Sequence, residues 1–294
     1  MAKFLRDYLL TVQGAYEQVV EITMPLTLEL DISRNNLASA NTGNFRIYNL
    51  SEAKRRLIYK DQYDVTNYRY IELRAGYNPD QNQDKKLLPV VFRGNILSCQ
   101  SFRQGVNNIT EIRAYDGGFA IANSFTSQTL GVSLGQKEVI NALMKDLAHT
   151  TIGAIGDFTG SGSRGQVMFG NTADLLNNLS GGGFFIDNEK AYALKNNECI
   201  YGDVSIINSE TGLLSSPIRS GQQLTFDMIF EPKLSVGQFI ELQSSTNKNF
   251  NGAYQVIGFH HKGTISGAVS GSLISSVNLF MGTGPLHLLK GITK

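Results

Sequence analysis

Residues 26–32, which read LTLELDI, alternate apolar and polar side chains along their whole length. Successive side chains of a β-strand point to opposite faces, so this period of two predicts a strand with one buried face. Similar segments recur through the first 115 residues. The further predicted strands are FRIYNL (45–50), YRYIELRAGY (68–77), LPVVFRGNILSC (88–99) and ITEIRAY (109–115). Residues 1–115 therefore predict an all-β domain.

Two segments in this region break the strand pattern. Residues 51–58, SEAKRRLI, predict a short helix capped by Ser51. Residues 77–86, YNPDQNQDKK, are rich in turn-forming residues and predict an exposed hairpin loop.

The period changes to that of a helix after the DGG turn at residues 116–118. QKEVINALMKDLAH predicts one helix over 136–148, because its apolar residues recur every three or four positions and Ser133 and Gln136 are spaced as a capping box. NTADLLNNLSGGG predicts a second helix over 172–180, capped by Asn171 or Thr172 and ended by Gly181. Residues 116–183 therefore predict a small mixed α/β segment.

The period of two returns from residue 184 to residue 282, which predicts a second β domain. Residues 283–294 form a tail with a Gly/Pro break, expected to be disordered or to dock on a neighbour. The fold class predicted from these segments is mainly β, with a small helical insertion between two β regions. The predicted strands of the second region are GFFID (183–187), KAYALK (190–195), QLTFDMIF (223–230), QFIELQSS (238–245), AYQVIGFHH (253–261) and SLISSVNLFM (272–281).

Charge and composition argue against a nucleic-acid-binding protein and against a membrane-spanning protein. The 26 basic and 25 acidic residues give a net charge of +1, which leaves no broad basic surface for stable nucleic-acid binding. No segment approaches the roughly 20 apolar residues that span a bilayer, and the N-terminus lacks the apolar run of a signal peptide. We expect a soluble protein made in the cytoplasm. Cys99 and Cys199 are expected to be buried thiols rather than a disulfide.

A possible nucleotide site is GSGSRG at residues 160–165, where Gly160, Gly162 and Gly165 have the G-x-G-x-x-G spacing of dinucleotide-binding loops. Such a loop requires a buried strand before it and a helix starting within it. The segment before it contains two glycines and predicts a poor strand, and the segment after it is broken by Gly170 and Asn171. Asp187 lies at about the right distance for a ribose contact. We favour a flexible Gly/Ser connection and keep a nucleotide-binding enzyme as an alternative.

Other candidates for chemistry are isolated. His260 and His261 are neighbours in a predicted strand and would point to opposite faces, so they could not bind one metal ion together. His149 is expected at a helix end. Asp116 is interpreted as a turn residue rather than a catalytic carboxylate, and Glu210 has no identifiable acidic partner for glycoside hydrolysis. The sequence therefore predicts no catalytic, cofactor-binding or metal-binding residues.

The order of several short motifs resembles that of another class of protein. FRGNI (92–96), EIRAYDGG (111–118), SETGLLSSP (209–217), FEPKLSVGQFIEL (230–242) and NGAYQVIGFHHKG (251–263) together resemble the baseplate hub proteins of contractile-tailed bacteriophages, a family related to the hub part of type VI secretion spikes. The resemblance covers residues 20–280. The chain is short for that family, which leaves any wall-degrading activity to other chains.

The resemblance implies a non-enzymatic structural protein of the phage virion, assembled in the host cytoplasm without cofactors. Residues 1–115 and 184–282 would each form a tail-tube-like barrel, and a homotrimer would present six barrels as the conduit for the genome. Implied partners are a spike below, a tube or tube-initiator protein above, and baseplate wedge or sheath-associated proteins. Another β-rich tail component is the alternative. Glu210 and Thr211 are expected either to set a local turn or to make an intersubunit contact, and the residues proposed for that contact are Glu210, Thr211, Gly212 and Leu213.

Overall fold

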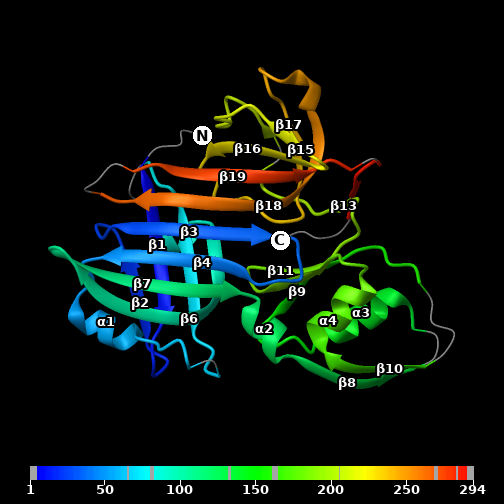
Figure 1. Cartoon of the computed structure of the whole chain (residues 1–294), viewed down its shortest axis with the longest axis horizontal. Coiled ribbons are helices and arrows are strands. Elements are labelled where there is room, and N and C mark those ends of the chain that lie inside the picture. Colours follow the sequence, from blue (N-terminus) through cyan, green and yellow to red (C-terminus); the bar gives the residue numbers. More distant parts are fainter. Residues whose placement is uncertain are drawn as a thin grey trace.

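The computed structural model describes residues 5–64, 66–79, 83–131, 134–160, 165–204, 206–267, 271–282 and 284–289. The chain is built mainly of β-strands, as predicted, and Figure 1 shows helices α2, α3 and α4 together at one corner of the molecule, with α1 apart from them on the opposite side. Most strands of both predicted β regions join one large sheet. Its order is β15-β16-β19-β18-β3-β4-β7-β6-β5-β1-β2, with β17 paired to β18 and β14 to β17.

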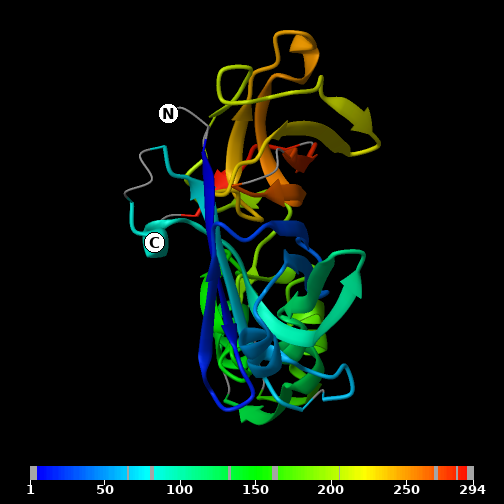
Figure 2. The same cartoon turned by 90° about the vertical axis from the view of Figure 1, so that its left-hand side faces the viewer.

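The first β region contributes seven strands, which Figure 2 shows from the side. The predicted strands start within four residues of the observed ones, and the structure adds two N-terminal strands that the sequence did not delimit. Helix α1, Glu52–Ile58, follows Ser51 as predicted, although the Ser51 side chain makes no capping hydrogen bond. The strands are β1 (Arg6–Gln13), β2 (Val19–Thr23), β3 (Leu28–Asn35), β4 (Asn41–Tyr48), β5 (Tyr70–Tyr77), β6 (Val90–Gln104) and β7 (Asn107–Asp116), with a 3-10 turn η1 (Lys85–Leu87).

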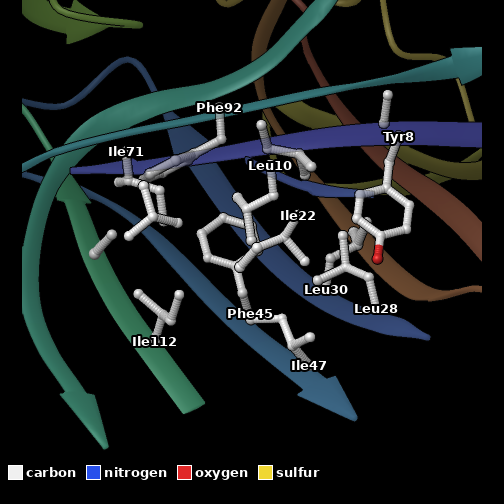
Figure 3. Packing of buried hydrophobic residues seen from close by; sticks show 14 of the residues in the cluster. Tyr8, Leu10, Ile22, Leu28, Leu30, Phe45, Ile47, Ile71, Phe92 and Ile112 are labelled. Atoms are coloured by element: carbon white, nitrogen blue, oxygen red, sulfur yellow. The ribbon is translucent and has the colours of Figure 1, made fainter. Parts of the chain in front are cut away.

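This part of the sheet curls around a core, because β1 and β2 cross behind β3 and β4 (Figure 1). The alternation in β3 places Leu28, Leu30 and Ile32 inside. Phe45 and Phe92 meet edge to face with ring centroids 5.4 Å apart (Figure 3). A Cβ at Gly43 would lie within 2.9 Å of both rings, so glycine at this position permits their close packing.

The second β region packs around a separate core formed by residues of β16, β17, β18 and β19. In β16, Leu224, Phe226 and Met228 lie inside on one face, as the alternation predicts. The strands of this region are β13 (Glu198–Cys199), β14 (Ile206–Ile207), β15 (Ile218–Ser220), β16 (Gln223–Ile229), β17 (Phe239–Leu242), β18 (Gly252–Ile265), β19 (Leu273–Phe280) and β20 (His287–Leu288), with a 3-10 turn η2 (Lys248–Phe250).

The two β regions meet edge to edge, because β18 pairs with β3 in antiparallel register from Gly258 opposite Asn35 to Ile265 opposite Leu28. Residues of the second region also enter the first core: Phe230, Ile265 and Leu273 pack there. The Tyr77 hydroxyl donates a hydrogen bond of 2.8 Å to the Phe230 carbonyl. The two cores are therefore linked by a continuous sheet.

The mixed segment packs around a third core between two helices and two small sheets. Strands β11 and β12, which the sequence placed in the second β region, pair with each other, and β12 pairs with β9 in a separate three-stranded sheet. The elements are α2 (Gly118–Asn123), β8 (Phe125–Leu130), α3 (Gln136–Met144), β9 (Thr151–Ile155), β10 (Gln166–Asn171), α4 (Thr172–Leu179), β11 (Phe184–Asp187) and β12 (Lys190–Ala193).

Helix α4 begins as predicted, since the Asn171 side chain accepts hydrogen bonds from the amides of Ala173 and Asp174. Helix α3 is shorter than the predicted 136–148. Its end tightens into a 3-10-like turn, in which the amides of Lys145, Asp146 and Leu147 bond to carbonyls three residues back. Gly135 occupies its N-cap position, and Ser133 lies outside the described residues.

The described part of the tail docks on its own chain. Strand β20 pairs in parallel with β13, and Leu289 is buried in the second core. Both cysteines are buried free thiols, as expected, and burial raises the pKa of each to about 12.

Candidate interaction surfaces

The loop predicted as an intersubunit contact is a turn organised by Asn208. The Asn208 carboxamide oxygen accepts hydrogen bonds from the amides of Glu210 and Thr211, at 3.0 and 2.9 Å. The Thr211 hydroxyl oxygen accepts the amide of Asn208 at 2.8 Å. Asparagine and threonine side chains commonly fix turns in this way. Thr211 therefore sets the local turn, one of the two roles considered from the sequence.

The rest of this loop joins the turn to strand β16. Gly212 has a positive φ of 109°, and its carbonyl accepts the amide of Ile229 at 2.8 Å. Leu213 forms an isolated bridge with Met228 and packs on the second core. Glu210 is exposed at the tip of the turn. Within this loop, Glu210 offers a side chain to solvent, and a subunit contact through it stays a prediction.

The GSGSRG motif lies in a context unlike that of a dinucleotide fingerprint. Gly160 and Gly165 are described, whereas residues 161–164, including Gly162, lie outside the described residues. The motif is followed by strand β10 rather than by a helix, and helix α4 begins only at Thr172. Asp187, the candidate ribose ligand, forms a buried ion pair with Arg34 at 2.8 Å. The helix N-terminus beside the described part of the motif is that of α3, where the Gln136 amide donates to the Gly160 carbonyl at 2.6 Å. This helix precedes the motif in the chain, whereas a dinucleotide fingerprint opens the helix that follows it.

The spacing G-x-S-x-G, typical of hydrolase nucleophiles, occurs at residues 131–135. In a hydrolase this motif follows a strand of a mainly parallel sheet. Here it follows β8, which pairs only with β10 in an antiparallel two-stranded ribbon. Residues 132 and 133 lie outside the described part of the chain. The surrounding strands do not provide the framework that a nucleophile elbow requires.

A buried polar network joins the first β region to the turn between β11 and β12. Asp116, at the end of β7, is fully buried, and its carboxylate accepts the amides of Asn188 and Glu189 at 2.6 and 2.8 Å. The Asn41 side chain donates to the Ile186 carbonyl at 2.8 Å. Asp116 ends β7 just before Gly117, which has the positive φ of 74° expected for a turn at DGG, and its buried carboxylate is in addition an acceptor that holds a distant turn.

Arg34 connects the same turn to the sheet from the other side. It is 2% exposed, and it donates to Asp187, to the Asn188 side chain and to the backbone carbonyl of Val91. Asp187 and Asn188 lie at the end of β11 and in the turn after it, and Val91 lies on β6. The guanidinium of Arg34 therefore joins three segments, which are β3, β6 and this turn. The network fixes the mixed segment against the large sheet.

Burial changes the protonation of two acids in this network. It raises the pKa of Asp116 to about 6, with Arg34 opposing the shift and the charge of Asp187 adding to it. Burial also raises the pKa of Glu189 to about 7, although the hydrogen bond from the Tyr68 hydroxyl opposes the shift. Perturbed acids often mark catalytic sites. Here both lie within a structural network, which accounts for their shifts.

The histidines are separated. His260 and His261 point to opposite faces of β18, as predicted: His260 bonds to Asp31 at 2.8 Å, and buried His261 bonds to Ser275 at 2.8 Å. Burial holds the pKa of His261 well below its usual value. His149 does not end a helix, because α3 stops at Met144; its ring stacks on Tyr68 at 3.9 Å. Among the described residues, no group of three metal-binding side chains lies close together.

The outward face of the sheet at the seam of the two β regions carries a charged hollow of about 740 Å³. Strands β3, β4, β7 and β18 supply its lining. Glu111 pairs with Arg46 and Arg113 at 3.0 and 2.9 Å, and Asp31 pairs with Lys262 at 3.2 Å. Positive and negative groups alternate across the strands, so this surface is highly polar without a large excess of one charge.

The described helices include none with the length and apolarity needed to cross a membrane.

Solved structures with the same fold are phage tail proteins. The 43 kDa tail protein of prophage MuSo2 from Shewanella oneidensis has a TM-score of 0.60 at 7% identity, covering 94% of this chain and 96% of that one. A tail protein from Neisseria meningitidis has a TM-score of 0.54 at 10% identity, covering 93% and 96%. A chain of the half-lidded Francisella PdpA-VgrG complex has a TM-score of 0.52 at 7% identity, covering 98% of this chain and 60% of that one.

The chain thus shares its fold with phage tail proteins and with a chain of a VgrG complex. A search of curated proteins gives no match. The chain belongs to the baseplate hub gp41 family, whose model matches residues 9–262, so the resemblance noted from the sequence is confirmed. It is accordingly a structural protein of the phage tail baseplate and a component of the virion.

Proposed function

We propose that three copies of this chain form a ring that adapts a threefold spike to a sixfold tail tube and serves as the conduit for the genome. The observation that carries the proposal is the presence of two sheet-built units with separate cores in one chain, joined through β3 and β18. Three such chains would present six similar units around an axis. The two units would correspond to barrel domains over residues 1–115 and 184–282.

The charge distribution supports a conduit. Passage of DNA requires a surface that does not retain the phosphate backbone. The chain has a net charge of +1, and the cations beside the hollow at the seam are paired with carboxylates. Such a surface would attract a polyanion weakly.

The partners proposed for the ring are the spike, the tube or tube-initiator protein, and baseplate wedge or sheath-associated proteins of a contractile tail. The fold likeness to a chain of a VgrG complex supports contact with a spike component. We assign no catalytic activity to the ring. A different structural position in the tail, in the tube or beside the spike, is the second candidate, since the same fold occurs in proteins described only as tail proteins.

Molar mass in solution tests the ring. Light scattering of the purified chain alone is expected to give three times the chain mass of 32.3 kDa, and with its spike protein three chain masses in addition to the mass of the bound spike. Negative-stain images should show rings about as wide as a tail tube. A monomer or a dimer under both conditions would contradict the proposal, and co-purification with the tube but not with the spike would favour the second candidate.

The exposed Glu210 is tested in the same assay. If the turn at residues 208–213 makes a subunit contact, Glu210→Ala should weaken the trimer without unfolding the chain, because the turn itself is held by Asn208 and Thr211. An unchanged trimer would count against a contact through this side chain.

A further inference from the structure

The turn that joins β11 to β12 contains a residue that is unusual for its backbone conformation. Asn188 and Glu189 both have positive φ angles, of 52° and 57°, as in the two-residue type I′ turn of a hairpin. Asparagine is common in this conformation, whereas the second position is usually glycine, because a longer side chain is strained there. Contacts of the Glu189 side chain and backbone must offset this strain.

Glu189 lies half-buried between the mixed segment and the first β region. Its carboxylate accepts a hydrogen bond from the Tyr68 hydroxyl, and the Tyr68 ring stacks on His149 with ring centroids 3.9 Å apart. The Glu189 amide donates to Asp116 at 2.8 Å, and the Glu189 carbonyl accepts the Thr151 amide at 2.9 Å. One residue thus joins the end of β7, the segment before β5 and the start of β9.

The carboxylates around this turn are unequally matched by cations. Asp187 pairs with Arg34 at 2.8 Å, and Glu72 accepts the Nε of Arg93 at 2.9 Å. Among the described residues, Glu189 forms no ion pair with a lysine, arginine or histidine. An ionised Glu189 would therefore add a carboxylate to a cluster whose cations are already engaged. The charged and titratable groups that face Glu189 are Tyr68 before β5, Tyr70 and Glu72 on β5, Arg93 on β6, Asp116 at the end of β7 and His149 after α3.

The space beside Glu189 is too small to solvate a charge. A cavity of about 10 Å³ lies there, between Tyr68, Asn95, His149 and the Glu189 side chain, among others. Such a volume holds at most one water molecule. Burial accordingly raises the pKa of Glu189 to about 7, although the hydrogen bond from Tyr68 opposes the shift. Ionisation of Glu189 therefore favours a movement of the turn that brings the carboxylate into solvent.

The mixed segment has anchors that do not depend on this turn. Ala191 and Ala193 pack in the third core, and β12 keeps its pairing with β9. Phe185 and Leu194 pack in the second core. Because these anchors lie on the strands and not on the turn, the turn can move by local opening while the segment stays folded.

We propose that the turn at Asn188 and Glu189 is a pH-dependent latch, which stays packed on the first β region while Glu189 is protonated and separates from it when Glu189 ionises. The closed latch binds the proton with a pKa of about 7, against about 4.3 for an exposed glutamate. Closure is therefore most favourable below about pH 4.3 and weakens as the pH rises toward 7. Burial raises the pKa of Asp116 to about 6, which acts in the same direction.

Hydrogen exchange of the full chain, read by mass spectrometry of peptides covering residues 149–155 and 184–193, measures the opening. The amides of Asn188, Glu189 and Thr151 report it, because their acceptors lie on the two sides of the latch. Dividing each exchange rate by the intrinsic rate at the same pH gives an opening constant. In the wild type this constant should be at least about tenfold larger at pH 7.5 than at pH 5.5, since it changes up to tenfold per pH unit between the two pKa values.

Three variants assign the effect to Glu189. Glu189→Gln should lose most of the pH dependence, and Asp116 accounts for what remains. Lys190→Gln is the matched control, because it removes an exposed charge from the next position and should keep the dependence. Tyr68→Phe keeps the aromatic ring but removes the donor that stabilises the ionised carboxylate, so the dependence should extend to a higher pH. Circular dichroism checks that each variant is folded.

Helix α3 provides the internal reference for global unfolding, because its buried residues lie in the third core. Opening constants of α3 that stay level while those of the turn rise with pH would support the latch. If the two rise in parallel, the whole chain opens and the latch is wrong. An opening constant of the turn that does not depend on pH, or a dependence that survives unchanged in Glu189→Gln, would equally overturn the proposal.

Discussion

At the scale of single residues, the molecule depends on buried polar groups that join distant segments. Arg34 and Asp187 are separated by 153 positions and have almost no exposed side-chain area. A buried ion pair is weak evidence for net stability, but loss of one partner leaves a charge without compensation. The same reasoning applies to Asp116, whose carboxylate holds two backbone amides.

Arg34→Met should destabilise the chain by about 3–5 kcal/mol, since it leaves Asp187 buried without its cation. Denaturant unfolding followed by circular dichroism measures this loss. The double variant Arg34→Met with Asp187→Leu is the control and should recover part of the stability. If the double variant is as unstable as the sum of the two single variants, the pair does not act as a unit.

Glu189→Gln should flatten the dependence of stability on pH. The pKa of Glu189 is about 7 in the folded chain and that of an exposed glutamate is about 4.3, so the folded state binds the proton more tightly. Its contribution to stability therefore grows as the pH falls from 7 toward 4.3 and is lost above about 7. We expect the free energy of unfolding to change less between pH 7.5 and pH 5 in the variant than in the wild type. Titration of His261 and Asp116 also changes the free energy of unfolding, but it does so in both proteins, so the difference between them reports on Glu189. Equal changes in the two proteins would contradict this role of Glu189.

At the scale of elements, the limits of a helix depend on the side-chain caps and backbone hydrogen bonds at its ends. Helix α4 has a complete N-terminal cap and a buried stripe, and its predicted start is observed. Helix α3 lacks a side-chain cap bond and ends in a tighter turn earlier than predicted. Side-chain capping and local backbone bonding thus decide the helix limits in this segment.

Asn171→Ala should cost about 1 kcal/mol, because it removes the acceptor for the amides of Ala173 and Asp174 at the start of α4. Thermal or denaturant unfolding measures the change. Asn178→Ala, on the exposed side of the same helix, should be close to neutral or slightly stabilising. A similar loss in both variants would show that the cap is not the cause.

At the scale of the whole molecule, the continuous sheet couples the two β regions. The β3–β18 pairing spans eight residue pairs, and Phe230 from the second region packs in the first core. Cys99 lies in the first core, and Cys199 is buried in the second region, on β13. The two thiols are therefore natural probes of the opening of each region.

Thiol labelling of the single-cysteine variants Cys199→Ala and Cys99→Ala in increasing denaturant should give transitions that coincide with the loss of circular dichroism of each variant. Coupled regions unfold together, so neither thiol should become reactive before the global transition. Because each alanine variant shifts its own stability, each labelling curve is compared with the unfolding curve of the same variant. Reaction of one thiol well below its own midpoint would show that its region opens independently.

The sequence by itself determined which segments become strands and which of their faces are buried. The alternation in β3 and β16, the cap of α4 and the burial of both cysteines were all readable, because each depends on local spacing or on the chemistry of one residue. Only the tertiary structure decided which edges pair: β18 with β3, and β12 with β11 and β9 in a small sheet rather than with the large sheet. It also assigned Asp116 to a turn more than 70 positions away. The physical reason is that a strand's backbone edges carry the same hydrogen-bonding groups whatever its sequence, so the choice of partner depends on how the whole chain packs.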